Sequence, residues 1–341
     1  MVGVALFGAG RIGRLHARNL VGHPRARLLA VYDVVEDAKR EVAAETGARP
    51  AASVEEAMGV PGVEAVVIAT STDTHVDLIV KAVEAGKAVF CEKPIDLDLA
   101  RVAACWRAIA PLEPLVQIGF NRRFDPSFAE LKARLARGEL GRLWQLIITS
   151  RDPDLPPRPY LERSGGLFRD MTIHDFDLAR FLLPEEPVEV AAVAGALVEP
   201  GLQSLGDHDT AMVLLRTAGG IQVCITNCRR AAYGYDQRVE AMGERGALLV
   251  GNPRPHTVER WDAAATEARA TLMPFFLERY AESYRLELDA FLRAVERREP
   301  VPVGFADGWR ALLLAQAAYE ALARGGWVRV EEVAAPFGQF S

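Results

Sequence analysis

A glycine-rich turn directly after the first apolar run, Val2–Phe7, constrains the fold of this 341-residue chain more than any other feature. The turn reads Gly-Ala-Gly-Arg-Ile-Gly and precedes a segment with helical spacing, residues 14–21. Gly8 allows a tight turn, Gly10 lets the backbone approach a pyrophosphate, and Gly13 permits close packing of helix against strand. The helix N-terminus then faces the phosphate charge. The pattern predicts a dinucleotide-binding turn made of Gly8, Gly10, Arg11, Ile12 and Gly13.

An acidic residue ends the second apolar run, Leu28–Tyr32. Asp33 lies twenty residues after Gly13, where this fingerprint expects a carboxylate for the ribose hydroxyls. Val34 and Val35 follow it, in place of the Arg or Ser that would accept a 2'-phosphate. A 2'-phosphate would meet repulsion and find no cation, so NAD is favoured over NADP as the cofactor.

The spacing of apolar residues changes near residue 120. Before that point short apolar runs alternate with helical patterns, which predicts an α/β fold with an N-terminal Rossmann dinucleotide-binding domain, residues 1–120. After it, longer alternating runs with turns at glycine pairs predict a C-terminal α+β domain, residues 121–341, with a large, mostly antiparallel open sheet. Two helices, 277–297 and 307–324, are expected to complete it. The proline-rich segment 151–163 is expected to be a loop or lid without regular structure.

Lys93 follows the strand expected at Lys87–Cys91, so it should project from the carboxyl edge of the sheet, where open α/β folds bind ligands. Only five of the 40 basic residues are lysines. An ammonium whose pKa moves on burial suits proton chemistry better than a guanidinium does. A lone Lys-Pro is most simply a solvated turn, but its place after a nucleotide-binding pattern favours a catalytic role. We also expect the Lys93–Pro94 peptide bond to be cis.

Polar segments follow two further strands at the same edge. The loop 70–75, Thr-Ser-Thr-Asp-Thr-His, comes after the apolar strand Val63–Ala69, and His75 is either a cofactor contact or a surface histidine. The run 121–125, Asn-Arg-Arg-Phe-Asp, comes after the last parallel strand and can line the same cleft. In these segments and around Lys93, the expected cofactor contacts are Thr70, Ser71, His75, Glu92, Lys93 and Asn121.

The second half of the chain contributes a carboxylate and an imidazole. Asp170 and His174 are four residues apart and share a face if their helix reaches back to Asp170. A carboxylate beside an imidazole fixes its tautomer and stabilises the imidazolium, as a general base requires. Alternatively Asp170 caps the helix and His174 is a core histidine. Gly165 and Gly166, which allow close backbone approach to a ligand, favour the catalytic alternative.

Composition narrows the possible partners. The net charge of -6 and pI near 5.7 supply no basic field for nucleic acid. No apolar run approaches the ~20 residues of a membrane span, and Met1 leads straight into a strand without a charged leader, so we expect a cytoplasmic protein. The cysteines lack the paired spacing of a zinc site, so no metal is expected. They are expected to be small buried hydrophobes: Cys91, Cys105, Cys224 and Cys228.

Three motifs together resemble the Gfo/Idh/MocA oxidoreductases over nearly the whole chain: the glycine turn at 8–13, Glu-Lys-Pro at 92–94, and Gly-Gly-x-x-x-Asp-x-x-x-His at 165–174. Within that family, the runs 117–125, 169–177 and 233–236 are most similar to the inositol 2-dehydrogenases. Two positions depart from the pattern: Thr-Ser-Thr at 70–72 replaces a common Thr-Pro-Asn, and Asp152 stands where inositol enzymes can carry Asn.

The resemblance implies both residue roles and an assembly. Lys93, Asp170 and His174 are its catalytic residues. Its oligomer, a tetramer or dimer, is built on the sheet of the second domain. The residues it implies for substrate binding are Lys93, Arg122, Asp152, Asp170, His174 and Tyr233.

We therefore expect an NAD-dependent dehydrogenase of a cyclic polyol, which converts myo-inositol to 2-keto-myo-inositol (scyllo-inosose). His174 would take the hydroxyl proton while Lys93 steadies the oxygen and Asp170 orients the pair. The roles of His174 and Lys93 can be exchanged, because the two groups can share one coupled proton network. The alternatives are a dehydrogenase of scyllo-inositol or another sugar, a retaining glycosidase that uses NAD transiently, and a non-catalytic NAD-binding sensor or regulator.

Overall fold

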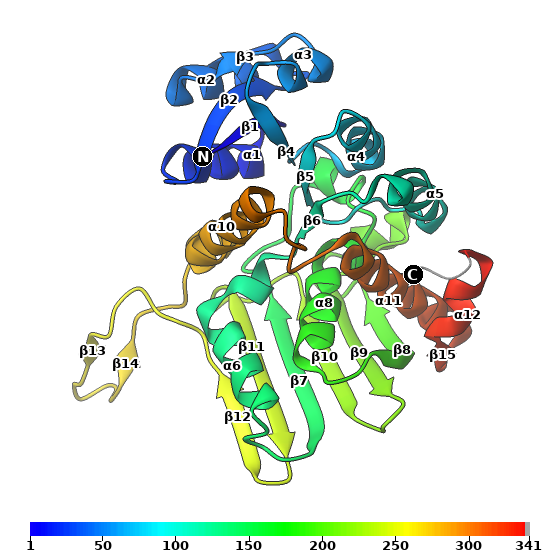
Figure 1. The fold of residues 1–341 in the computed structure, drawn as a ribbon. Coiled ribbons are helices and arrows are strands. Elements are labelled where there is room, and N and C mark those ends of the chain that lie inside the picture. The colour runs from blue at the N-terminus through cyan, green and yellow to red at the C-terminus, as the bar shows by residue number, and fades with distance from the viewer. Residues whose placement is uncertain (338–341) are drawn as a thin grey trace. The chain divides into compact units, whose positions relative to one another are not determined.

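The computed structural model describes residues 1–337, which form two compact units (Figure 1). The first unit contains Met1–Phe124 and Glu282–Leu312, and the second contains Asp125–Ala281 and Leu313–Pro336. Neither unit is continuous in sequence. The segment Glu282–Leu312 packs with the dinucleotide-binding half, although its sequence position lies within the range expected for the second domain.

The first unit is built on a six-stranded parallel sheet in the order β3-β2-β1-β4-β5-β6. This is the doubly wound order, in which the chain reverses direction across the sheet between β1 and β4. β1 is buried along its whole length, which explains its continuous apolar sequence. The expected Rossmann fold is confirmed. The strands are β1 Val2–Phe7, β2 Ala26–Tyr32, β3 Arg49–Pro50, β4 Val63–Ile68, β5 Ala88–Glu92 and β6 Val116–Gly119.

Helices follow the strands of this unit, and two of them begin at residues whose side chains cap the helix. Ser53 accepts a hydrogen bond from the Glu56 amide, and Asp98 accepts one from the Ala100 amide, which satisfies donors that a helix start leaves unpaired. A helix from the far end of the chain, α10, adds Phe291 to the same apolar core. The helices are α1 Arg11–Val21, α2 Glu36–Thr46, α3 Val54–Met58, η1 Thr72–Thr74, α4 His75–Glu84, α5 Leu99–Ile109, η2 Ala110–Leu112, η3 Asn121–Phe124 and α10 Ala281–Arg297.

The second unit is built on a seven-stranded sheet in the order β12-β11-β7-β10-β9-β8-β15. Its described strand pairs are antiparallel except β10 with β7, which run parallel. The expected mostly antiparallel sheet is confirmed. The strands are β7 Leu143–Arg151, β8 Pro187–Gly195, β9 Thr210–Thr217, β10 Gln222–Cys228, β11 Asp236–Gly243, β12 Gly246–Val250 and β15 Val328–Arg329.

Three segments after residue 150 differ from expectation. The proline-rich segment contains a one-turn helix, α7 Arg158–Leu161, because Pro159 lies in its first turn, where proline has no amide to lose. The helix expected over 277–297 is interrupted at Tyr280, which separates α9 Phe276–Arg279 from α10. A short hairpin, β13 Glu259–Arg260 with β14 Ala268–Arg269, was also not expected. The remaining helices are α6 Pro126–Ala136, η4 Phe168–Thr172, α8 Ile173–Leu182, η5 Pro200–Leu205, α11 Phe305–Arg324, α12 Val330–Ala334 and η6 Ala335–Phe337.

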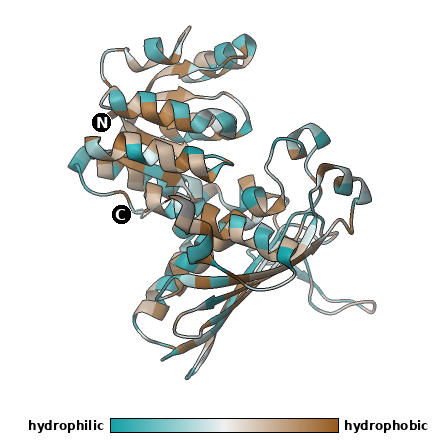
Figure 2. Cartoon of the chain, turned by 90° about the vertical axis from the view of Figure 1, so that its right-hand side faces the viewer, coloured by the Kyte–Doolittle hydropathy of each residue, from teal (hydrophilic) through white to brown (hydrophobic). Residues whose placement is uncertain are grey.

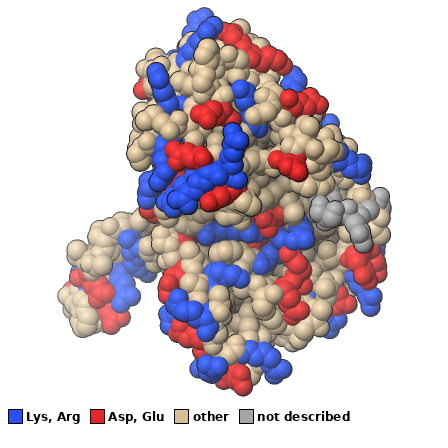
Figure 3. All heavy atoms as spheres, viewed as in Figure 1, with Lys and Arg blue, Asp and Glu red and all other residues tan. Residues whose placement is uncertain are grey.

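Apolar residues concentrate in the strands of both sheets, while most helices show one apolar and one polar side (Figure 2). Basic and acidic side chains are interspersed on the face of the described residues shown in Figure 3. None of the helices among residues 1–337 is long and apolar enough to cross a bilayer. Cys91 and Cys105 are buried as expected, whereas Cys224 and Cys228 are only half-buried. Burial raises the pKa of the Cys105 thiol to about 12.

Candidate functional site

The cofactor candidates of the first unit lie at one edge of its sheet. β1 leads to Gly8, β2 to Asp33, β4 to Thr70, β5 to Lys93 and β6 to Asn121. Because the strands are parallel, all these positions follow the carboxyl ends of strands and share that edge. The structure therefore brings together in one place the residues that the sequence assigned to the cofactor.

The three glycines of the first turn are needed for different reasons. Gly8 has a φ of +97°, and a Cβ there would lie 2.3 Å from the Ala69 carbonyl oxygen. A Cβ on Gly13 would lie 2.0 Å from the Gly8 carbonyl oxygen. A Cβ on Gly10 would meet nothing within 4 Å, so the open space there suits an external group. Since the start of α1 has no side-chain cap, its amides and this space fit the pyrophosphate of NAD.

Asp33 is held firmly at the end of β2. Its Oδ2 accepts a hydrogen bond from the Ala9 amide at 2.6 Å, and its Oδ1 accepts one from the Val35 amide at 2.7 Å. The side chain of the intervening Val34 is 86% exposed. The carboxylate is thus fixed beside the glycine turn, where it can accept hydrogen bonds from ribose hydroxyls.

His75 is buried, so the alternative of a surface histidine is wrong. Its Nδ1 lies 2.8 Å from the Pro94 carbonyl oxygen and its Nε2 lies 3.2 Å from the Thr70 carbonyl oxygen. Burial lowers the pKa of the imidazole, which favours a neutral ring with a single N–H. We place that N–H on Nδ1, towards the nearer carbonyl. The ring thus joins the Thr70 loop to the Lys93–Pro94 turn, whose peptide bond is cis as predicted.

The segment after β6 is also buried. Asn121 is 2% exposed, and its Nδ2 has no hydrogen-bond partner among the described residues. An unpaired buried amide donor fits a polar ligand, because leaving it unsatisfied is costly. Arg122, which the resemblance assigns to the substrate, is 4% exposed. Arg123 instead donates to Asp307 Oδ1 at 2.9 Å, within the first unit.

Asp170 lies in a π-helix, a feature that the sequence did not reveal. The chain forms a π-helical turn over Phe168–Thr172, and α8 begins at Ile173. The helix does reach back to Asp170, but with a wider turn than the α-helical spacing assumed; such π turns occur often at functional sites. The preceding glycines were expected to allow close approach of the backbone to a ligand. In the structure the group that lies close is the Tyr319 side chain, because a Cβ on Gly166 would lie 2.3 Å from the Tyr319 hydroxyl.

Arg229 is the functional residue of the second unit that sequence reasoning missed. Its side chain is 1% exposed, and its Nη1 donates to Asp170 Oδ2 at 3.0 Å. The Tyr160 hydroxyl donates to the other oxygen, Asp170 Oδ1, at 2.7 Å. Burial acts to lower the pKa of Arg229, but Asp170, Asp207 and Asp152 together raise it. A buried guanidinium thus lies among three carboxylates, two of which belong to the predicted site.

Tyr233 and Asp152 lie near this cluster in the fold of the second unit. The Tyr233 side chain is 48% exposed; its hydroxyl donates to Asp236 Oδ2 at 2.8 Å and accepts from Arg151 Nη1 at 2.7 Å. Partial burial, followed by the bond to Asp236, raises the pKa of the phenol. The backbone of Asp152 bonds to the loop after β10 on both sides, through Cys228 and Ala231.

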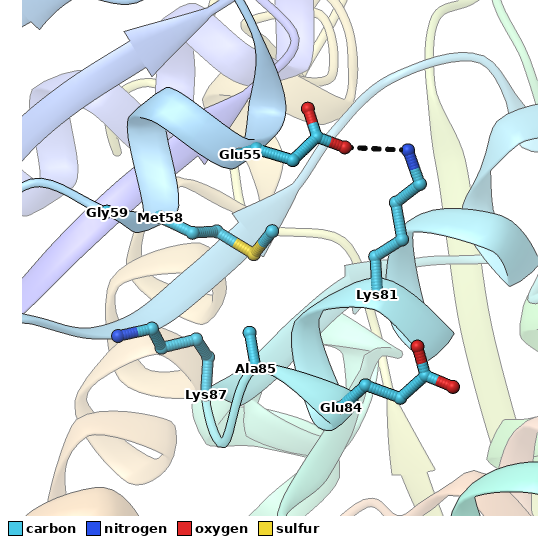
Figure 4. Close-up of a pocket in the computed structure, with 7 residues that line it drawn as sticks. All are labelled: Glu55, Met58, Gly59, Lys81, Glu84, Ala85 and Lys87. Carbon is cyan, nitrogen blue, oxygen red and sulfur yellow. Dashed lines mark hydrogen bonds and ion pairs between the residues drawn. The ribbon is translucent and has the colours of Figure 1, made fainter.

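A surface depression in the first unit lies away from these residues (Figure 4). Its lining comes from the ends of α3 and α4 and from the residue before β5, so it lies at the amino edge of the sheet, opposite the carboxyl edge. The Lys81 Nζ donates to Glu55 Oε1 across it at 2.8 Å. The lining residues are Glu55, Met58, Gly59, Lys81, Glu84, Ala85 and Lys87. We assign no chemistry to this depression.

Comparison with known protein families identifies the family to which both halves of the chain belong. Residues 2–120 match the oxidoreductase family with an NAD-binding Rossmann fold, and residues 128–249 match the GFO/IDH/MocA C-terminal domain. The chain belongs to the GFO/IDH/MocA oxidoreductase family. The predicted family and the predicted NAD cofactor are both confirmed.

Several similar proteins align with most of the length of this chain. An inositol 2-dehydrogenase of Rhizobium meliloti is 45% identical over 93% of this chain and 96% of its own. A scyllo-inositol 2-dehydrogenase (NAD⁺) of Bacillus subtilis is 36% identical over 85% of each chain. The crystal structure of a myo-inositol dehydrogenase from Corynebacterium glutamicum is 43% identical, with a TM-score of 0.93 over 96% of this chain and 98% of that one.

Proposed function

We propose that this protein oxidises one secondary hydroxyl of myo-inositol to the ketone, 2-keto-myo-inositol, with NAD as the oxidant. The observation that carries the proposal is the 45% identity to an inositol 2-dehydrogenase over 93% of the chain. The residues support it, because Lys93 follows a strand at the cofactor edge and Asp170 is held by Arg229 and Tyr160.

We assign the proton chemistry to Lys93, Asp170 and His174. His174 accepts the hydroxyl proton, and Lys93 donates a hydrogen bond to the oxygen as negative charge develops on it. Both oxygens of Asp170 already accept hydrogen bonds, from Tyr160 and Arg229, so the carboxylate stays in one orientation. Its negative charge favours the protonated form of neighbouring groups. NAD, which the glycine turn and Asp33 would hold, would supply the oxidant for removal of hydride from the same carbon. Arg122, Asp152 and Tyr233 are the proposed contacts to the other hydroxyls.

Unpaired buried donors and an unpaired acceptor in the second unit favour a substrate with many hydroxyls. Arg229 Nε and Nη2 have no hydrogen-bond partner among the described residues, and neither does Asp207 Oδ2. Each buried polar atom left unsatisfied costs about 1 to 3 kcal/mol. A polyol, directly or through ordered water, can satisfy such atoms, whereas an apolar alcohol cannot.

A substrate panel tests the proposal. We expect NAD reduction with myo-inositol at a kcat/KM at least about tenfold above that with glucose, a difference of about 1.4 kcal/mol in transition-state binding, and little reduction with simple secondary alcohols. The measurement is NADH absorbance under initial-rate conditions. A panel in which glucose or another aldose exceeds every inositol by tenfold would overturn the substrate and leave the dehydrogenase chemistry standing.

The same panel separates the alternatives. The B. subtilis relative named for scyllo-inositol makes that isomer the main competitor, so both inositols are included. A retaining glycosidase would cleave glycosides without net NADH formation, and a sensor would bind NAD without turnover. The presence of Lys93, Asp170 and His174 argues against a sensor, since binding alone needs no base.

We also propose that the protein is a homo-oligomer, a tetramer or dimer, assembled through the open face of the second sheet. Outward side chains on neighbouring strands are apolar there: Ile147, Cys224 and Leu214 are consecutive partners across β7, β10 and β9. Met212 and Val193, paired between β9 and β8, are 59% and 58% exposed. A contiguous apolar face of this kind marks an interaction surface.

We also propose that the protein is cytoplasmic, because the half-buried Cys224 and Cys228 are free thiols.

Replacing Met212 and Val193 together by glutamate should dissociate the oligomer, because like charges would then face one another across the interface. Sedimentation velocity is expected to give a multiple of the 37.2 kDa chain mass for the wild type and a smaller multiple for the variant. A wild-type protein that sediments as a monomer at micromolar concentration would refute the assembly.

A further inference from the structure

Three titratable side chains form a buried cluster in the first unit, and two of them, His16 and Glu287, are not among the residues assigned to cofactor or substrate. His16 comes from α1, Glu92 from the end of β5, and Glu287 from α10. One nitrogen or oxygen atom of each lies within 4.8 Å of those of the other two. His16 Nε2 is 2.7 Å from Glu92 Oε1, a hydrogen-bond distance. His16 and Glu287 are fully buried, and the Glu92 side chain is 12% exposed.

Glu287 is the anomalous member. Neither of its carboxyl oxygens has a hydrogen-bond partner among residues 1–337. The backbone nearby is ordinary: the Glu287 carbonyl oxygen accepts from Gln117 Nε2 at 2.9 Å. An ionised carboxylate in such a position, beside the second carboxylate of Glu92, would be very costly. Something must neutralise Glu287, and the choice lies between a proton and a cation.

The distances favour a proton. Ligands of one Zn²⁺ lie about 2.0 to 2.2 Å from the ion, so two of them sit roughly 3 Å or more apart. His16 Nε2 and Glu92 Oε1 are closer than that and already satisfy each other. The cluster supplies no fourth side chain within the same radius among the described residues. A separation of no more than 4.8 Å between Glu287 and its neighbours instead suits one bridging water.

We infer that His16, Glu92 and Glu287 form a buried proton-binding site in which Glu287 is a neutral carboxylic acid at neutral pH. Its O–H donates towards Glu92 through one bridging water and so completes the hydrogen bonds of that carboxylate. Burial, and next the charge of Glu92, raise the pKa of Glu287 well above its usual range. Other titratable groups near the cluster are Tyr284 of α10, whose ring lies edge-on to His16, and His75 and Cys91, each of which interacts electrostatically with Glu92.

The buried proton-binding site also fixes the position of Lys93, the proposed catalytic lysine, through the adjacent residue Glu92. Glu92 is the last residue of β5 and directly precedes Lys93. On the other side it is confined by β6, where a Cβ on Gly119 would lie 3.0 Å from Glu92 Oε2. A fixed Glu92 therefore fixes the backbone from which Lys93 projects. Glu287 acts through Glu92, so it is a positioning residue, and this consequence rests on the function proposed above.

Infrared difference spectroscopy tests the proton directly. At pH 7 the wild type minus Glu287→Gln spectrum is expected to show the carbonyl stretch of a protonated carboxylic acid, which Glu282→Gln, an exposed acid on the same helix, does not remove. This readout needs neither substrate nor turnover, so it is independent of the proposed function. Absence of the band would overturn the inference, and so would stoichiometric metal in the purified protein whose removal by chelator lowers the melting temperature.

The pH dependence of stability supplies a second readout. A carboxyl whose folded-state pKa lies above its unfolded-state pKa loses stabilisation as pH rises between the two. The unfolding equilibrium constants of wild type and Glu287→Gln should therefore diverge by up to about tenfold for each pH unit above the unfolded-state pKa, with the wild type becoming the less stable. For positioning, Glu287→Gln should keep kcat within about threefold, while Glu287→Leu lowers it about tenfold or more. The proposal would be contradicted if wild type and Glu287→Gln showed the same pH dependence of stability. It would also be contradicted if Glu287→Gln and Glu287→Leu had equal kcat.

Discussion

Lys93→Ala and His174→Ala are each expected to lower kcat by about 100-fold or more, because loss of a positioned acid or base removes its proton transfer from the transition state. NAD should still bind, since the glycine turn and Asp33 lie on other strands of the sheet. Initial rates of NADH formation with myo-inositol measure the first effect, and quenching of intrinsic fluorescence on NAD addition measures the second.

Matched controls are available for both residues. Lys81→Ala removes a lysine that is paired with Glu55 at the opposite edge of the sheet, and His256→Ala removes an exposed histidine in the second unit. Both controls should retain wild-type kcat. A Lys93 or His174 variant with normal turnover would exclude that residue from the mechanism.

Arg229→Leu should lower the free energy of unfolding by about 3 to 5 kcal/mol, the usual effect of breaking a buried ion pair from one side. The variant removes the hydrogen bond from Arg229 to Asp170 Oδ2, while Asp170 Oδ1 still accepts from the Tyr160 hydroxyl, and it removes a buried cation that interacts with Asp152 and Asp207. Urea denaturation measures the loss, and kcat with myo-inositol should fall in the same variant because Asp170 is no longer held in one orientation.

The adjacent residue provides the comparison. Arg230 is 60% exposed, and its nearest acidic partner, Asp154, is 3.8 Å away. Arg230→Leu should change the free energy of unfolding by less than about 1 kcal/mol. Equal stability of the two variants would mean that Arg229 is not the structural support of Asp170 that the distances indicate.

The fold could be predicted largely because local patterns and tertiary packing agree. The glycine turn, the continuous apolar β1 and the capping residues Ser53 and Asp98 each predict the element that forms. The parallel pairing of β10 with β7 was not predictable, since hydrophobic alternation is the same in either strand direction. Nor did the periodicity reveal the π turn at Asp170, because one extra residue per turn hardly changes an apolar face over five residues.

The position of the cofactor candidates at one edge of the sheet was also readable from the sequence, because these residues follow neighbouring parallel strands, while their contacts with NAD stay a prediction. The partners of Asp170 were not. Arg229 stands in a Cys-Arg-Arg run that looks like an exposed pair, and only its position just after β10 distinguishes it from Arg230. Glu287 likewise resembles an ordinary polar position of an amphipathic helix. In both cases the partner lies more than 50 residues away in sequence, so no local spacing connects them.

The discontinuity of the first unit has a consequence for how the protein must be made. The core beneath β1, β4 and β5 is closed by Leu288, Phe291 and Leu292 of α10, and Gln117 bonds to a backbone carbonyl 170 residues further along the chain. On the ribosome, the whole six-stranded sheet emerges long before that helix is synthesised. Until then the apolar surface around Phe90 lacks the cover that α10 gives it, so the core of the nucleotide-binding half cannot be completed before the part of the chain that starts at Ala281 begins to emerge.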